Sequence, residues 1–270
     1  MSNQLSLEET HLAYLKQLTG HNFDSLDSPI RRRFAGTQIV AHVIEPQTPD
    51  ELKFDIFYRV NTGGEPLSAQ EIRHCMSKEP SRDLLYQLVT DPAFDEATAR
   101  TFFKRGPGGM PVRDSRRMAD RELALRFCAF RLSTISTYER ASSLDGFLLD
   151  FTRLIDTKLS NDERDELRAA FSRAMINSAA ILQDAAFRRW APDAARRGPI
   201  NRAVFESQAL ALADYPLDVL LPHSNEIKFA FRSLFDVADY DSAVRFGTGD
   251  PRKLERRLET TRNVLGKILG

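Results

Sequence analysis

The sequence has few of the residues that carry metal or redox chemistry. It contains two cysteines, Cys75 and Cys128, and five scattered histidines. No Cys-x-x-Cys or His-x-x-x-His spacing occurs, so no metal site is predicted. Both cysteines occupy apolar positions of predicted helices, which indicates buried free thiols in a reducing, cytoplasmic environment.

Net charge and long apolar runs are also missing. The chain carries 38 basic Lys and Arg residues and 38 acidic Asp and Glu residues, a formal net charge of +0. No overall field therefore draws it toward nucleic acid or an anionic membrane. No segment approaches about 18 continuous apolar residues, and no basic stretch followed by an apolar run marks the N-terminus. We expect a protein with neither a membrane span nor a signal peptide.

Strand-forming sequence is scarce too. Only residues 38–44 read as a strand, because this segment contains two adjacent pairs of β-branched residues and Pro46 follows it. His42, inside it, is interpreted as a core histidine rather than a ligand. A single strand is not stable alone. We therefore predict an edge that is exposed or that pairs with another chain, either a different protein or a second copy in a homo-oligomer.

Most of the chain is instead predicted to be helical, which gives a mainly α member of the α+β class. Apolar periodicity, caps and glycine or proline stops define the segments. The predicted helices span 7–18, 28–34, 49–60, 69–76, 83–90, a short segment ending near Phe103, 119–137, 144–159, 161–185, 201–213, 225–235 and 251–269.

Residues 104–118 are rich in glycine, proline and arginine and are predicted to form a loop. One interpretation is a basic loop that contacts nucleic-acid phosphates through Arg105, Arg113, Arg116 and Arg117. The other is a solvated loop whose arginines pair with nearby acidic helices, as charge runs commonly do. Both interpretations stay open.

The most informative stretch joins two predicted helices, 49–60 and 69–76. Gly63 and Gly64 end the first helix, because glycine adopts the left-handed conformation that a helix end requires. The spacing predicts a capping box at the start of each helix. These boxes are Thr48 with Glu51 and Ser68 with Glu71.

Backbone N–H groups of this turn would face an anion at a helix N-terminus. Arg59 and Arg73 flank the turn with planar donors suited to phosphate, whereas Glu65 and Glu71 place negative charge nearby. The alternative is a well-capped helix–loop–helix without a ligand, in which Arg73 pairs with an acid and stiffens the loop. The candidate phosphate-binding residues are Arg59, Asn61, Thr62, Gly63, Gly64 and Arg73.

Residues 55–73 closely resemble the segment IFxRLNTGGxPLxxQEIR of the GmrSD-type family. These prokaryotic proteins carry a ParB-like nuclease domain and belong to type IV restriction and other anti-phage systems. The match is long and chemically mixed, and weaker similarities extend it over nearly the whole chain. They lie at 22–26, 31–34, 120–127, 246–249 and 256–257.

The resemblance implies that residues 1–77 form the distal part of an incomplete ParB-like domain and that 78–270 form a helical domain. Family members normally carry an upstream Asp-Gly-Gln-Gln-Arg motif that implies nucleotide hydrolysis or DNA cleavage, and this motif is absent here. We expect either an N-terminally shortened member or a missing half supplied by another chain. No catalytic residue is assigned, and no Ser/His/Asp or Cys/His set replaces the motif.

Three functions remain open at this point. The chain is a component of an anti-phage system that binds nucleotide or DNA through residues 61–73 without being catalytic alone. Alternatively, it is a non-catalytic regulator or partner subunit that completes a ParB-like nuclease or NTPase. The third function is a nuclease or NTPase whose start is truncated, for which the family implies a nucleoside triphosphate with a divalent metal as cofactor.

Overall fold

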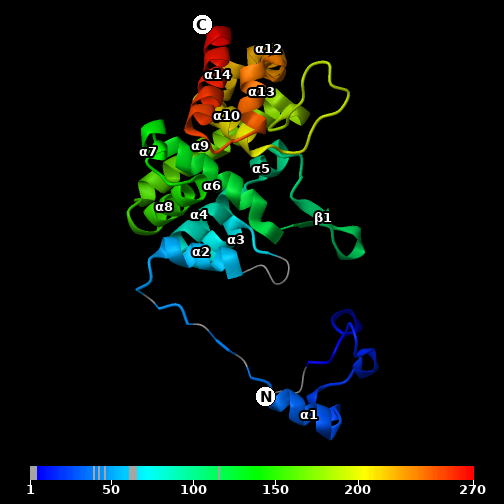
Figure 1. Ribbon diagram of the computed structural model, residues 1–270. Helices are drawn as coiled ribbons and strands as arrows, with labels where there is room; N and C mark the ends of the chain where they lie inside the picture. The colour runs from blue at the N-terminus through cyan, green and yellow to red at the C-terminus, as the bar shows by residue number, and fades with distance from the viewer. Residues whose placement is uncertain (1–4, 39, 42, 46, 61–65, 115) are drawn as a thin grey trace. The chain divides into compact units, whose positions relative to one another are not determined.

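The computed structural model describes residues 5–38, 40–41, 43–45, 47–60, 66–114 and 116–270. The chain separates into two compact units, Met1–Thr48 (unit 1) and Pro49–Gly270 (unit 2). The structure is mainly helical, and its described part contains one sheet, an antiparallel pair of strands. The mainly α character predicted from the sequence is therefore confirmed (Figure 1).

Unit 1 contains three 3₁₀ turns, Glu9–His11, Lys16–Leu18 and Phe23–Ser25, and the helix α1 (Ser28–Ala35). The helix α1 was predicted, but the helix predicted at 7–18 is wrong. The Leu7 N–H donates to the His21 carbonyl at 2.8 Å, and the Gly20 N–H donates to the Leu7 carbonyl at 2.8 Å. These two bonds join Leu7 to a later part of the same chain and hold it in a loop, so its backbone does not start a helix.

The strand predicted at 38–44 does not form in the described residues. Positions 38, 40, 41, 43 and 44 have no regular structure, while Ile39 and His42 lie outside the described residues. Val40 and Val43 expose 79% and 82% of their surface. The physical reason is that a strand requires a neighbour for its backbone hydrogen bonds, and none pairs with these residues in the described part of the chain.

Unit 2 is built from helices joined by turns and by a longer connection at residues 186–201. Thirteen α-helical segments belong to it in the described residues: α2 (Asp50–Val60), α3 (Ala69–Met76), α4 (Glu79–Thr90), α5 (Pro92–Ala97), α6 (Ala119–Leu132), α7 (Ile135–Glu139), α8 (Leu144–Thr157), α9 (Asn161–Asn177), α10 (Arg202–Leu212), α11 (Leu217–Leu220), α12 (Ser224–Ser233), α13 (Ala238–Arg245) and α14 (Pro251–Leu269).

Some helices of unit 2 differ from those predicted. The single helix expected at 119–137 is two helices, because Thr134 caps α7 by accepting from the Thr137 N–H at 3.2 Å. The helices α11 and α13 were not predicted. At the end of α9 the chain continues through a π-helical turn, Ser178–Leu182, and a 3₁₀ turn, Gln183–Ala185, which matches the predicted end near Ala185.

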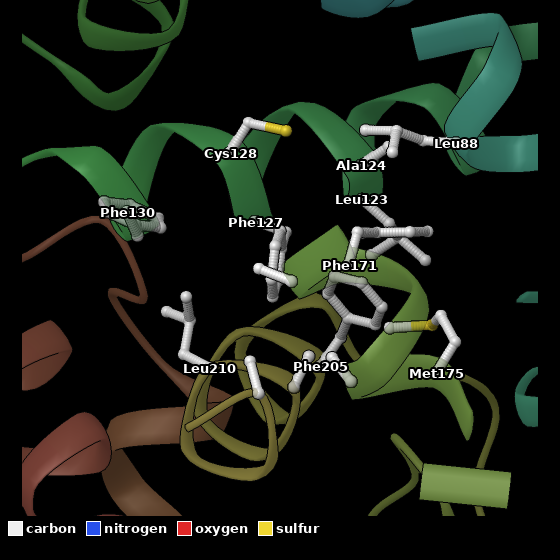
Figure 2. Packing of buried hydrophobic residues seen from close by; sticks show 14 of the residues in the cluster. Leu88, Leu123, Ala124, Phe127, Cys128, Phe130, Phe171, Met175, Phe205 and Leu210 are labelled. Carbon is white, nitrogen blue, oxygen red and sulfur yellow. The ribbon is translucent and has the colours of Figure 1, made fainter. Parts of the chain in front are cut away.

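The core of unit 2 lies where α6, α9 and α10 meet (Figure 2). The Phe171 ring packs edge-on against Phe127, with ring centroids 5.2 Å apart, and also contacts Phe94 of α5 at 5.8 Å. Burial in this core raises the pKa of Cys128 to about 12, so the thiol is not reactive at neutral pH. Cys75 on α3 is exposed, so the prediction that both thiols are buried is wrong for it. Every residue from Ala203 to Leu212 is buried, which makes α10 the central helix.

The predicted loop at 104–118 contains a β-hairpin instead. The strands β1 (Phe103–Arg105) and β2 (Pro111–Arg113) pair antiparallel, with Phe103 opposite Arg113. Gly108 and Gly109 adopt positive φ angles of 68° and 81° and allow the chain to reverse. The Arg113 guanidinium lies 4.9 Å from the Phe103 ring centroid, so a cation–π contact joins the strands.

The boundary between the two units follows Thr48, whereas the sequence placed a boundary after Ser77. The helix α2 packs on α3, and α3 packs on α6 and α8 of the helical body. Ile72 of α3 is buried in that contact. The helices α2 and α3, at the two ends of residues 55–73 (the resemblance segment), therefore belong to unit 2.

Candidate functional site

The described part of the resemblance segment begins its second helix with a reciprocal cap, as predicted. The Ser68 hydroxyl accepts from the Glu71 N–H at 3.1 Å, and the Glu71 carboxylate accepts from the Ser68 N–H at 2.6 Å. Burial alone would raise the pKa of Glu71, but the hydrogen bonds from Ser68 and the nearby Arg117 charge lower it overall. The N–H groups of Ser68 and Glu71 are thus already satisfied within the chain.

Arg117 folds over this helix start from 49 positions away in the sequence. Its carbonyl accepts from the Ser68 hydroxyl at 2.9 Å, and its guanidinium donates to the Pro66 carbonyl and lies 3.5 Å from the Glu71 carboxylate. A left-handed backbone with φ of 65° directs Arg117 into this position. Arg117 therefore closes the N-terminus of α3.

Arg73 lies in the interior, with 0% of its surface exposed. Its Nε donates to Gln70 Oε1 at 2.9 Å, and its Nη1 donates to Asp145 Oδ1 at 2.7 Å. Burial lowers the pKa of Arg73, and the bond and charge of Asp145 oppose that shift. Its Nη2 is buried and has no hydrogen-bond acceptor among the described residues. The acid that pairs with Arg73 is Asp145 at the start of α8.

The remaining phosphate-binding candidates are only partly described. Arg59 lies exposed on the last turn of α2, where its Nη2 is 2.9 Å from Asp55 Oδ2. Asn61, Thr62, Gly63 and Gly64 lie outside the described residues, as do Glu65 and the side chain of Glu51, so the Thr48–Glu51 capping box is not described either. Among the described residues of the resemblance segment, Arg59 is the phosphate-binding candidate whose positive charge lies at the surface.

The basic candidates at 104–118 separate into different environments. Arg113 pairs with Asp95 and lies 3.7 Å from Asp120, while Arg117 lies against Glu71. Arg105 is exposed on β1, and the side chain of Arg116 lies outside the described residues. The pairing of two of these arginines with acids follows the alternative interpretation of the loop.

Sequence reasoning missed a set of buried charged residues between α6, α10 and α14, which we call the buried charge network: Glu122, Arg126, Glu206 and Arg257. In the sequence, these residues are recognisable only as charged residues at helical positions where apolar core residues would be expected. Glu206, for example, lies between Phe205 and Leu210. That pattern does not indicate which partners meet.

Comparison with protein-family models, with curated proteins and with solved structures finds no match to this chain. No group of three His, Cys, Asp or Glu side chains that could hold a metal ion occurs among residues placed by the structure. In that same part of the chain, no helix is both long and apolar enough to cross a membrane.

We expect Arg73→Ala to lower the free energy of unfolding by roughly 2–3 kcal/mol, because it removes one buried and one part-buried hydrogen bond from a charged donor. For a chain of this size the melting temperature should fall by roughly 5–10 °C. Arg59→Ala, an exposed change in the same segment, should leave it nearly unaltered. Thermal melts with calorimetric titration of nucleotides and short duplex DNA test this. An unchanged melting temperature with lost ligand affinity in Arg73→Ala would instead assign the residue to ligand binding.

Proposed function

We propose that this chain is a component of a GmrSD-like prokaryotic anti-phage system. In that system it acts as a non-catalytic partner subunit that binds a second protein chain through unit 1. The similarity of residues 55–73 to the GmrSD-type segment supports the system. The role of partner subunit is supported by the distribution of apolar side chains, which is the observation that carries the proposal.

Unit 1 buries few apolar side chains and exposes many. Of its described residues, Leu18 and Leu26 are the large apolar side chains that are buried, each 9% exposed. Two such residues make a small core for 48 residues. The exposed large apolar side chains of unit 1 are Leu5, Tyr14, Leu15, Phe23, Phe34, Val40 and Val43. Apolar exposure on this scale is typical of a surface that binds another protein.

Residues 38–44 suggest how such a partner would bind. Val40 and Val43 are exposed, and the described backbone around them has no ladder partner. A segment of this kind can add a strand to the open edge of another protein's sheet, where main-chain hydrogen bonds supply affinity and alternating side chains supply specificity. A ParB-like chain that offers a sheet edge has the chemistry required of this partner.

Charge placement favours a partner role over nucleotide or DNA binding by the chain alone. Arg73 is buried against Asp145, Arg117 closes the start of α3, and Arg113 pairs with Asp95. A phosphate would have to displace these internal partners, which costs the hydrogen bonds that they already make. The Asp-Gly-Gln-Gln-Arg motif is also absent from these 270 residues.

The double variant Val40→Asp/Val43→Asp should weaken complex formation with a ParB-like protein that carries the Asp-Gly-Gln-Gln-Arg motif and is encoded beside this gene. In an added strand Val40 and Val43 point to opposite faces, so at least one of the two charges lies unpaired in the interface and affinity should fall at least tenfold. Calorimetric titration and sedimentation of the purified full-length chains measure this.

Val219→Asp on α11 of unit 2, at a valine that is 43% exposed, is the control and should bind as the wild type does. Wild-type chain that does not bind the ParB-like protein, or binding that both variants retain, would refute the proposal. Nuclease or NTPase activity of the isolated chain that is lost in Arg59→Ala would replace it with the enzymatic alternative.

A further inference from the structure

The buried charge network is a continuous set of ion pairs across three helices. Glu206 of α10, with 0% of its surface exposed, uses both carboxylate oxygens. Its Oε1 accepts from Arg126 Nη1 at 2.7 Å, and its Oε2 accepts from Nη2 and, at 3.1 Å, from Nε of Arg257 on α14. Arg126 continues the set along α6, where its Nη2 and Nε donate to Glu122 Oε1 at 2.7 and 2.9 Å.

The network lies next to the resemblance segment, because α3 packs on α6. The Glu122 charge raises the pKa of buried Arg73 of α3 and the Arg126 charge lowers it, so the two effects oppose each other. Arg73 in turn bonds to Asp145 of α8, and α3 packs directly on α6 and α8. The other oxygen of Glu122 lies 3.2 Å from Arg202 at the start of α10. Each carboxylate inside the network therefore contacts two cations.

We propose that the buried charge network couples α3 to α14, so that a change at α14 alters the stability of the helix that ends the resemblance segment. The physical reason is that buried charges depend on all of their partners at once. Removing one leaves another unpaired at low dielectric, and the remaining groups rearrange together rather than one by one. This inference stands on the geometry of unit 2 and does not depend on the proposed function.

Hydrogen exchange of the full-length chain tests the coupling. Arg257→Met retains much of the aliphatic volume but leaves Glu206 with one cation. We expect amide exchange to become at least tenfold faster in α3 as well as in α10 and α14. The control is Arg256→Met on the same helix, since Arg256 is exposed and pairs with Asp239 at 3.0 Å. It should leave α3 unchanged. Faster exchange confined to α10 and α14 would overturn the proposal.

A double-mutant cycle gives an independent measure. The Arg73→Met and Arg257→Met changes are made singly and together, and equilibrium unfolding constants are compared. Coupling predicts that the double variant departs from the product of the single effects by at least fivefold, whereas a product within error would refute it.

If Arg257→Met does not fold, the cycle is repeated in a background that carries Arg126→Met, Glu206→Leu and Arg257→Met. That background removes Glu206 together with its two cations and leaves Glu122 paired with Arg202 alone. Well-packed apolar replacements of buried ion pairs are tolerated. The effect of Arg73→Met on the unfolding constant should be at least fivefold smaller there than in the wild type. An equal effect in both backgrounds would refute the coupling.

Discussion

Glu206→Ala is expected to destabilise the protein by about 3–5 kcal/mol, the cost of breaking a buried ion pair by removing one partner. The change leaves the guanidinium groups of Arg126 and Arg257 buried with no shared carboxylate between them. It also removes packing from α10, the central helix of unit 2. The melting temperature should fall by roughly 10–15 °C. Urea unfolding followed by circular dichroism measures the loss.

Glu255→Ala supplies the control, because Glu255 is an exposed glutamate on α14. Its effect should lie within about 0.5 kcal/mol of zero, as is usual for surface substitutions. Equal stability of the Glu206 and Glu255 variants would mean that the buried carboxylate contributes nothing to the fold. That result would contradict the ion-pair geometry described above.

Phe171→Ala is expected to cost about 3–5 kcal/mol, as large-to-small changes of buried aromatic residues do. Phe171 is 0% exposed and contacts the ring of Phe127 on α6 (Figure 2). It also contacts the ring of Phe94 on α5. Removing its ring leaves a cavity at the junction of α5, α6 and α9, which rigid helices fill only in part. The urea midpoint should fall while the slope of the transition stays unchanged.

Ile176→Ala on the same helix is the matched control, since Ile176 is 45% exposed. It should cost less than about 1 kcal/mol, because little apolar surface leaves a buried environment. A Phe171 variant as stable as the Ile176 variant would show that the core relaxes around the missing ring. A changed slope would instead indicate a less compact native state or an unfolding that is not two-state.

The position and partners of Arg73 determine how the resemblance segment is interpreted. Spacing alone left Arg73 open as either a phosphate ligand or a brace. The structure places it between Gln70 and Asp145, inside the protein. Asp145 lies 72 positions away in the sequence, so no local pattern could identify it as the partner. The paired measurement of melting and ligand binding therefore tests the segment's role directly.

Local features were predictable because their interactions stay within a few residues. The Ser68–Glu71 capping box closes over three positions and formed as predicted, and Ser160 and Glu163 form a box of the same spacing at the start of α9. The long amphipathic helices, including α8 and α14, also lie where their apolar periodicity placed them. Helical hydrogen bonds join residues four apart, so a sequence window contains most of the information that defines such elements.

Strand predictions failed for the opposite reason. Residues 38–44 have strand composition, yet the described ones form no strand, while 103–105 and 111–113 pair across a glycine turn that was interpreted as a loop. A strand forms only when a second strand supplies its hydrogen bonds. Composition describes one side of that pair and does not identify the other.

The sequence by itself determined the mainly helical class, the starts of the long helices α8, α9 and α14, and the segment that resembles the GmrSD-type family. Only the tertiary structure decided which charges are buried, and with which partners. Glu206 meets Arg126 across 80 positions and Arg257 across 51, and Arg117 reaches Pro66 across 51. The free energy of a charged side chain depends on its solvent exposure and on its nearest opposite charge. Both are set when distant helices pack together.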